Sequence, residues 1–302
     1  MRILMTGASG FIGKQILNQI LSEGHSLVSL GRRAPEIQSS QVTFHPFDLN
    51  SDRLTFPEPP FDTILHFAGI ASGEGKSEKE YMDINFKSTE RLVRYAKDNS
   101  IPHFIFSSSA SVYGRSDSID EPLKEDSFLN GSTDYARSKI LAESLIRKEL
   151  TGYTIFRISS VYGIGGKGFV NKLIKLYRKK LFPYPLGGRG KKSFIHIQDL
   201  IEFVIRGLNQ KKFGVFNLAH PEIVSYKELL KEIERNYPGF ALRIPLPGFL
   251  ETWDFPKGLN SKLKPLFLQS LIDPQRAIHE FGFQPKVGMV EGMKGLRASE
   301  KL

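Results

Sequence analysis

The chain has 302 residues, of which 40% are hydrophobic and 25% charged, and it has no cysteine. These values are ordinary for a soluble globular protein with one large domain or two unequal ones. The lack of cysteine excludes disulfides, thiolate zinc sites and thiol nucleophiles, and we expect no metal centre. The sequence starts with a strand-like run that lacks the features of a signal peptide. No apolar stretch is long enough to span a bilayer. We therefore expect a cytoplasmic protein without a membrane partner.

The formal net charge is +10, and basic residues cluster at positions 172–180 and 189–192. One interpretation is a solvated helix face followed by a loop. A second is a positive field that attracts a nucleotide diphosphate. A nucleic-acid partner is not expected, because no recognised nucleic-acid-binding module accompanies the charge.

The first half of the chain alternates short apolar runs with helical patterns, which predicts βαβ units. The predicted strands are residues 2–6, 26–30, 41–47, 62–67, 103–107 and 154–158, and the predicted helices are 11–22, 78–99 and 133–150. We interpret residues 1–163 as a dinucleotide-binding domain of Rossmann type, with a doubly wound parallel α/β sheet.

The alternation is looser after residue 163. We predict helices at 169–180, 199–209, 225–236 and 274–281, a loop at 182–192, an extended segment at 193–197 and a strand at 215–218. Asp199 is the expected N-cap of its helix. Residues 164–302 are expected to form mainly a smaller mixed α/β substrate-binding lobe, with residues from about 193 to 220 returning to the first domain.

Three glycines, Gly7, Gly10 and Gly13, separate the first strand from the first helix. They permit a tight turn, close approach of backbone to a pyrophosphate, and helix–strand packing. The helix N-terminus supplies free N–H groups and a positive dipole for phosphates. The same turn places Ser9, Phe11 and Ile12 beside the cofactor.

The second strand ends in Gly31, followed by Arg32 and Arg33. An NAD site usually has an acidic residue near this point for the ribose 2′-hydroxyl. An arginine can instead pair with a 2′-phosphate, so we favour NADP over NAD. The alternative is that both arginines are loop charges. Asp48, with its neighbour Leu49, is placed either to accept a hydrogen bond from an adenine amine or to cap a helix.

The fourth strand leads into Phe67, Ala68 and Gly69, and we expect all three at the cofactor. The small size of Ala68 and Gly69 lets backbone approach it. His66 at this strand end is interpreted as structural. Asn85 can bridge strands or hold a water near the cofactor, or lie on the helix surface. Ser107, at the end of the fifth strand, is also expected at the cofactor.

Tyr135 and Lys139 are four residues apart on a predicted helix, so both project from one face. An ammonium beside a phenol favours the phenolate, and we therefore expect a lowered pKa for Tyr135. Ser109 follows the fifth strand, where open α/β sheets bind ligands. It can hydrogen-bond a substrate oxygen while Tyr135 exchanges a proton with that oxygen.

The segments 6–13, 107–114, 135–139, 157–163 and 194–199 together resemble the motifs of the extended short-chain dehydrogenase/reductase family. Within that family the chain is most similar to the NAD-dependent epimerase/dehydratase branch, which modifies nucleotide sugars. Residues 273–285 resemble the family's ending, so the resemblance covers about residues 1–295.

The resemblance implies that Tyr135 is the acid/base on the sugar oxygen and that Lys139 holds the nicotinamide ribose. It implies that Ser109 completes a catalytic triad. It also implies hydride transfer between the nicotinamide and a sugar carbon, most often C4, and a possible homodimer through a four-helix bundle. Candidate substrate-binding residues are Ser109, Ser111, Tyr113, Ser160 and Lys192. Tyr113 is either a wall of the sugar pocket or part of the core.

The sequence departs from relatives of this kind at four places. Sugar 4,6-dehydratases have an Asp-Glu pair where Ala110 and Ser111 stand, so 4,6-dehydration is not expected. UDP-galactose 4-epimerases have an Asn where Ser160 stands and a diphosphate-binding Arg where Lys192 stands. Lysine keeps the charge but loses the bidentate fork.

These departures, with Arg32 and Arg33, favour an NADP-dependent 4-keto reductase of a nucleotide-diphosphate sugar, an oxidoreductase of carbohydrate biosynthesis. The alternative is an NAD-dependent nucleotide-sugar 4-epimerase similar to UDP-glucose 4-epimerase. A hypothesis of another class is a dinucleotide-binding sensor or scaffold without catalysis.

Overall fold

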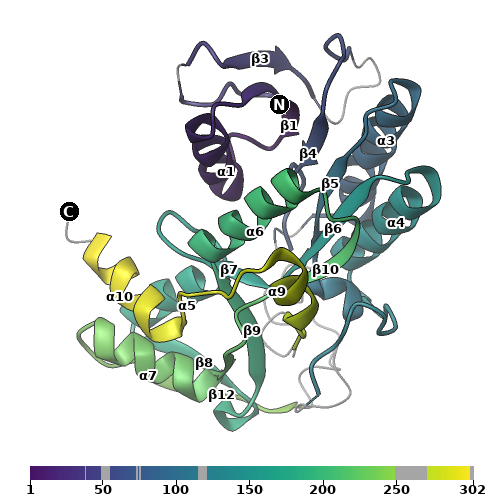
Figure 1. Ribbon diagram of the computed structural model, residues 1–302. Coiled ribbons are helices and arrows are strands. Elements are labelled where there is room, and N and C mark those ends of the chain that lie inside the picture. The colour runs from purple at the N-terminus through teal and green to yellow at the C-terminus, as the bar shows by residue number, and fades with distance from the viewer. Residues whose placement is uncertain are drawn as a thin grey trace.

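The computed structural model describes residues 1–37, 39–48, 55–72, 74, 76–114, 121–248 and 271–299. Its largest element is a seven-stranded sheet in which every neighbouring pair is parallel (Figure 1). The strands are β1 (Arg2–Thr6), β2 (Ser26–Gly31), β3 (Val42–Pro46), β4 (Thr63–His66), β5 (Phe104–Ser109), β6 (Tyr153–Ile158) and β10 (Gly214–Leu218).

The strand order is β10-β6-β5-β4-β1-β2-β3. The chain therefore winds outward in one direction from β1 to β3 and in the other from β4 to β6. Ligands of open α/β sheets bind outside the carboxyl ends of the strands where the order reverses, here between β1 and β4. The predicted Rossmann-type doubly wound sheet is confirmed.

Alternation along β1 divides the core of this sheet between two faces. Ile3 and Met5 pack with α1 (Phe11–Ser22), α6 (Ile197–Gln210) and α9 (Gln275–Phe281). Leu4 packs on the opposite face with α3 (Ser88–Asp98) and α4 (Asp134–Glu149). Figure 1 shows α1 and α6 on one side of the sheet and α3 and α4 on the other.

The helix predicted at 78–99 has three parts. An α-helical turn, α2 (Glu78–Tyr81), leads into a π-helix at Met82–Lys87, and α3 follows. The side chain of Ser77 accepts a hydrogen bond from the backbone of Glu80, and the Glu80 carboxylate accepts one from the backbone of Ser77. This capping box stabilises the start of the helix.

Most of the remaining elements form a second body around a core of their own. A three-stranded sheet contains β7 (Ser160–Tyr162), β9 (Lys191–His196) and β11 (Ile223–Ser225), and a parallel pair contains β8 (Leu181–Pro185) and β12 (Leu242–Leu246). Its helices are α5 (Phe169–Arg178), α7 (Tyr226–Asn236) and α10 (Met289–Ser299). Leu173, Phe182, Leu230 and Met293 contribute to its hydrophobic cluster.

Two predictions in this part were wrong. The expected loop at 182–192 contains most of β8, a 3₁₀ turn at Leu186–Gly188 and the start of β9. Helix α6 begins at Ile197, and the ring of its N-cap His196 accepts a hydrogen bond from the backbone N–H of Gln198 at 3.4 Å. Asp199, the predicted cap, lies inside the first turn, and its carboxylate accepts the backbone N–H groups of residues 286 and 287 instead.

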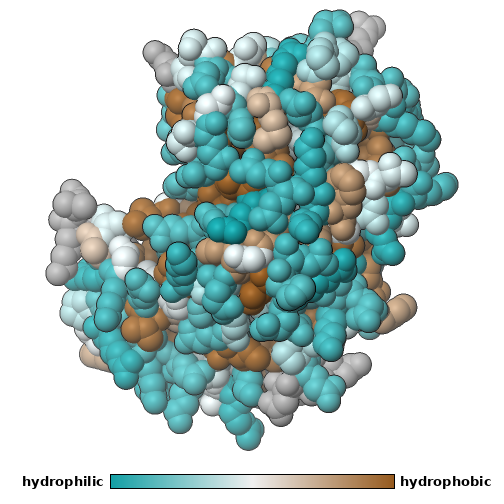
Figure 2. Space-filling view, in the orientation of Figure 1, coloured by the Kyte–Doolittle hydropathy of each residue, from teal (hydrophilic) through white to brown (hydrophobic). Residues whose placement is uncertain are grey.

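Hydrophilic residues cover most of the face shown in Figure 2, and hydrophobic residues show mainly between them. In the described part of the chain, no helix combines the length and apolar character needed to cross a bilayer.

Candidate active site

The glycine turn at the carboxyl end of β1 has the geometry of a phosphate cradle. Gly7 has φ +82°, a conformation that L side chains rarely adopt. A Cβ on Gly7 would lie 2.7 Å from the backbone of Phe67 and Ala68, and one on Gly13 would lie 2.0 Å from the Gly7 carbonyl oxygen. The backbone N–H of Gly10 donates to that same oxygen at 2.9 Å. Glycine is therefore required at Gly7 and Gly13 for packing alone.

The N-terminus of α1 is suited to a dinucleotide pyrophosphate. Gly10 is its N-cap, no side chain caps it, and its first turn has no acidic residue. Ser9 and Gly10 are exposed, and Phe11 and Ile12 are half-buried. The N–H groups and positive dipole of this turn can therefore meet phosphate oxygens. These residues fit a dinucleotide cofactor.

The residues predicted for the adenosine end lie after β2 and β3. Arg32 and Arg33 follow β2, both side chains are exposed, and neither forms an ion pair with the described residues. Asp48 is exposed after the buried Phe47. Leu49 lies outside the described residues.

The loop after β4 is held from two sides. The Thr6 hydroxyl accepts the backbone N–H of Ala68 at 3.2 Å. The Asn85 side chain accepts the N–H of Ile70 at 2.8 Å and donates to the carbonyl of Ile70 at 3.1 Å. Asn85 is 1% exposed, so the helix-surface alternative is wrong. Its contacts position the loop that contains Gly69, and a direct contact with the cofactor stays a prediction.

His66 is part of the packing, as the sequence indicated. Its ring nitrogens lie 2.7 Å from the Thr6 hydroxyl and 3.0 Å from the Thr89 hydroxyl. Burial, with a smaller effect of the Lys139 charge, lowers the pKa of His66 to about 3. The ring is therefore neutral at physiological pH.

The structure brings Ser109, Tyr135 and Lys139 together at the carboxyl end of β5. Ser109 is the last residue of β5, and Tyr135 and Lys139 lie on α4, whose N-terminus is capped by the side chain of Thr133. The Ser109 hydroxyl lies close enough to the Tyr135 phenol to influence its pKa. The Lys139 ammonium donates to the backbone carbonyl of Ser107 at 2.8 Å.

The expected lowering of the Tyr135 pKa is wrong for this structure. Burial raises the pKa of Tyr135 to about 12, and the nearby Ser109 hydroxyl offsets this rise only in part. Burial also lowers the pKa of Lys139 to about 8, while the Glu143 carboxylate acts in the opposite direction. The sequence spacing places Tyr135 and Lys139 on one face of α4. It gives no information on how far burial desolvates the two groups, and desolvation sets the direction of both pKa shifts.

A buried ion pair behind Lys139 was not predicted. Glu143 lies one helical turn after Lys139 and pairs with Arg157 of β6 at 2.7 Å, both side chains being 1% exposed. The Ser108 hydroxyl donates to the same carboxylate. The spacing 139–143 was the available signal, because residues four apart share a helix face.

The residues predicted for the substrate lie in different environments. The Ser111 hydroxyl is 3.0 Å from that of Ser109, and Ser160 is half-buried in β7. Tyr113 is 1% exposed, and its hydroxyl contacts Arg157 and Asn217, which places it in the core. Lys192 is buried, its ammonium lies 4.3 Å from the centre of the Phe169 ring, and burial lowers its pKa to about 8.

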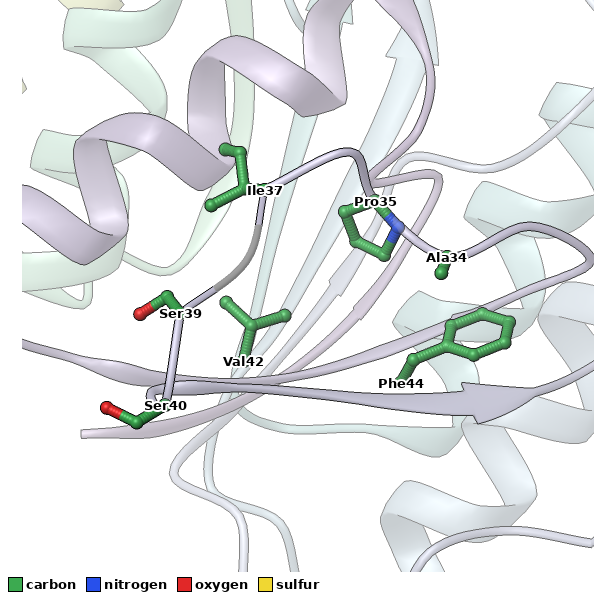
Figure 3. Close-up of a pocket in the computed structure, with 7 residues that line it drawn as sticks. All are labelled: Ala34, Pro35, Ile37, Ser39, Ser40, Val42 and Phe44. Carbon is green, nitrogen blue, oxygen red and sulfur yellow. The ribbon is translucent and has the colours of Figure 1, made fainter.

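An open pocket of roughly 600 Å³ lies beside the edge strand β3. Figure 3 shows the loop after β2 crossing over this strand. The pocket is lined by Ala34, Pro35, Ile37, Ser39, Ser40, Val42 and Phe44. It contains none of Ser109, Tyr135 and Lys139, so we do not assign the candidate active site to it.

Comparisons with known proteins agree with this geometry. Residues 3–219 match the model of the NAD dependent epimerase/dehydratase family. The chain is 33% identical over 262 residues to the UDP-glucose 4-epimerase GEPI42 of Cyamopsis tetragonoloba, covering 72% of this chain and 73% of that protein. It is 27% identical over 259 residues to a UDP-glucose 4-epimerase of Vibrio cholerae, covering 81% of this chain and 79% of that protein.

Solved structures share the fold. The UDP-glucuronic acid 4-epimerase from Bacillus cereus, in complex with UDP-glucuronic acid and NAD, superposes with a TM-score of 0.80 at 23% identity and covers 100% of this chain and 99% of its own. With the glycine turn and the Ser109, Tyr135 and Lys139 cluster in place, the chain belongs to the NAD-dependent epimerase/dehydratase family, whose members are enzymes of the extended short-chain dehydrogenase/reductase type.

Proposed function

We propose that the protein is a nucleotide-sugar 4-epimerase that uses a tightly held NAD. The observation that carries the proposal is the grouping of Ser109, Tyr135 and Lys139 at the carboxyl end of β5, on the side of the sheet where the glycine turn lies. The 4-epimerase relatives support it, and they reverse the order of preference that the sequence suggested. Ala110 and Ser111, in place of acidic residues, agree with a reaction that eliminates no water.

Tyr135 accepts a proton from the sugar C4 hydroxyl and later returns it. Ser109 hydrogen-bonds the same oxygen and orients it toward Tyr135. When bound, the nicotinamide cofactor supplies acceptance and return of the hydride. Because the pKa of Tyr135 is about 12 without ligands, its phenolate needs a further positive charge in the loaded site. The Lys139 ammonium is already within the site.

The proposed division of labour follows the two bodies of the fold. Residues 1–163, with a return at about 193–220, bind the dinucleotide. Residues 164–302 provide most of the nucleotide-sugar site, including Lys192 at the sugar diphosphate, and Ser160, just before this range, adds to that site.

A second candidate is an NADP-dependent 4-keto-sugar reductase. The exposed Arg32 and Arg33, which follow β2 and have no ion-pair partner among the described residues, favour it, because they can meet a 2′-phosphate. A reductase consumes NADPH in stoichiometric amounts, whereas an epimerase regenerates its cofactor in each cycle.

The test uses purified full-length protein in two assays. UDP-glucose, UDP-N-acetylglucosamine and UDP-glucuronic acid are each supplied without added cofactor, and 4-epimers are separated chromatographically. In parallel, NADPH or NADH is supplied with a nucleotide 4-keto sugar, and absorbance at about 340 nm is followed. Epimer formation with no net use of NAD(P)H supports the proposal. Consumption of NADPH without epimer formation would replace it by the reductase.

A sensor without catalysis gives neither signal, although it binds the dinucleotide. Both assays on wild-type protein and on Tyr135→Phe separate this hypothesis from the two enzymatic ones. An enzyme loses turnover in the variant and keeps its cofactor affinity.

A further inference from the structure

The excess of positive over negative charge in this chain corresponds to one stretch of sequence. Between Glu149 and Asp199 there are ten Lys and Arg residues and no Asp or Glu. The chain has 42 basic and 32 acidic residues, so the other 32 basic residues balance the acidic ones. The net charge of +10 therefore corresponds to this stretch, which runs from β6 to the start of α6. Of its ten basic residues, only Lys192 belongs to the proposed substrate site.

Exposed apolar side chains concentrate beside the same stretch. In the described residues, eleven large hydrophobic side chains are exposed, and five of them lie on the last turns of α5 or on β8, β12 and the turn before β12. These five are Leu176, Leu181, Phe240, Leu242 and Ile244, and Phe240 and Leu242 are 73% and 66% exposed. Single exposed hydrophobic residues need no explanation, but a cluster does.

The structure joins these side chains into one surface. Leu242 is the register partner of Leu181, and its backbone N–H donates to the carbonyl of Lys180 at 2.8 Å. Side chains alternate along a strand, so Leu181, Leu242 and Ile244 lie on one face of the β8–β12 pair. The Lys180 ammonium lies 5.7 Å from the centre of the Phe240 ring, which joins the exposed Phe to this face.

Positive charge borders this face. Lys175 and Lys179 are exposed on the last turns of α5, directly before Lys180, and none of the three forms an ion pair with the described residues. Acidic residues nearby on α7 already have partners, since Glu234 lies 3.6 Å from Arg243 and Glu232 pairs with Arg235. We call the five apolar residues with Lys175, Lys179 and Lys180 the basic-apolar surface.

We propose that the basic-apolar surface docks the enzyme on an anionic lipid bilayer. Lysines at a membrane surface are attracted by acidic headgroups, and aromatic and aliphatic side chains beside them enter the headgroup region. A soluble polyanion would be attracted by the lysines but would gain nothing from Phe240, Leu242 and Ile244. The apolar component therefore favours the bilayer over a nucleic acid or another soluble polyanion.

This contact needs no spanning segment, so it differs from the absence of a membrane partner that we expected from the sequence. That expectation considered only the length of apolar stretches. The basic-apolar surface joins residues 175–181 with 240–244, which come together only in the fold. Figure 1 shows β8 and β12 at the end of the molecule away from β3.

The experiment is sedimentation of the full-length protein with vesicles of phosphatidylcholine alone or with about one third phosphatidylglycerol. We expect binding only to the anionic vesicles, weakening as salt is raised because surface charges are screened. The triple variant Lys175→Glu, Lys179→Glu, Lys180→Glu is expected to bind at least about a hundredfold more weakly. A matched variant, Lys148→Glu, Lys286→Glu, Lys294→Glu, has the same net charge and is expected to bind within about threefold of wild type, the loss of distant attraction being small.

The apolar part is tested by Phe240→Ser with Leu242→Ser. Both side chains are exposed, so the fold is expected to persist, and circular dichroism and epimerase activity in solution check this. We expect vesicle binding to fall at least about tenfold and binding to soluble heparin to stay unchanged. Equal losses in the two triple variants, binding to uncharged vesicles, or unchanged vesicle binding by the double Ser variant would each overturn the proposal. Absence of vesicle binding by wild type would overturn it as well, without affecting the proposed 4-epimerase activity.

Discussion

The Nζ atom of Lys139 donates a hydrogen bond to the backbone carbonyl of Ser107 at 2.8 Å, in a position where the lysine is 4% exposed. The ammonium also lies 4.6 Å from the centre of the Phe106 ring. The nearest acidic residue along α4, Glu143, is already paired with Arg157. A carbonyl and a ring replace water only in part, which explains why burial lowers the pKa of Lys139 to about 8.

Replacing Lys139 by methionine is expected to stabilise the ligand-free protein at pH 7. The folded pKa of about 8 is below the unfolded value of 10.5, so charging Lys139 costs folding free energy. This cost is complete below pH 8, falls as the pH rises toward 10.5, and disappears above 10.5, where Lys139 is neutral in both states. Its size is about 3 kcal/mol, reduced by about 1 kcal/mol for the lost hydrogen bond.

Urea unfolding of wild type and Lys139→Met at pH 7, 8.5 and 10 measures this effect. The advantage of the variant is expected to shrink as the pH rises. Lys148→Met, at a side chain 80% exposed, is the control and is expected to run parallel to wild type. A difference between wild type and Lys139→Met that is constant with pH would contradict the buried-ammonium explanation.

Tyr135 is expected to stay protonated at pH 10.5 in the ligand-free protein. Its pKa is about 12, whereas an ordinary tyrosine with a pKa of 10 is mostly ionised at that pH. The measurement is the ultraviolet difference between wild type and Tyr135→Phe as the pH rises. Ser109→Ala is expected to raise the pKa further, because the nearby Ser109 hydroxyl lowers it. A midpoint below 10 would support the original sequence-based expectation.

Tyr135→Phe is expected to reduce kcat by about 10²–10⁴-fold, since it removes the group that moves the proton. Dinucleotide affinity is expected to remain within about threefold, because the phenol is outside the glycine turn. Tyr81→Phe is the matched control: the two rings are 5.9 Å apart, and the Tyr81 hydroxyl donates to the carbonyl of Ala71. Equal losses in both variants would point to packing instead of proton transfer.

Gly13→Ala is expected to abolish dinucleotide binding and to destabilise the protein. The new Cβ would lie 2.0 Å from the Gly7 carbonyl oxygen, so the turn has to open. Gly295→Ala in α10 adds the same methyl group where nothing lies within 4 Å. That control is expected to raise stability by about 1 kcal/mol, through helix propensity. Calorimetric titration with NAD and thermal melting distinguish the two; normal NAD binding by Gly13→Ala would refute the cradle.

Glu143→Ala is expected to lower the free energy of unfolding by about 3–5 kcal/mol, because it leaves the guanidinium of Arg157 buried without its carboxylate. Glu202→Ala removes the carboxylate partner of Arg206 from a pair on α6 that is open to solvent, and it is expected to cost less than about 1 kcal/mol. Urea denaturation at pH 7 measures both. If the two losses are similar, the pair behind Lys139 is not a structural anchor of α4.

Much of the large sheet was predictable, because buried parallel strands form short apolar runs. The elements β1, α1 and β6 were also easy to delimit, since turn-forming residues flank each of them. Tyr135 and Lys139 were also predictable as neighbours, since helical spacing alone puts them on one face. Strand β8 was missed because Pro183 and Pro185 suggest a loop. Proline is tolerated here because β8 pairs only with β12 within the described sheets. The direction of the Tyr135 pKa was wrong because burial depends on contacts far apart in sequence.

The π-helix at Met82–Lys87 makes the length of this helix part of the site. Asn85 lies within it, and one residue there corresponds to a rotation of about 100° around the helix axis. Removing one residue would convert the π-helix into an ordinary α-helix, which is a regular structure in itself. The same deletion would rotate Asn85 away from Ile70. The number of residues in this helix is thus constrained as well as their type. We expect insertions and deletions here to be selected against even where substitutions are tolerated.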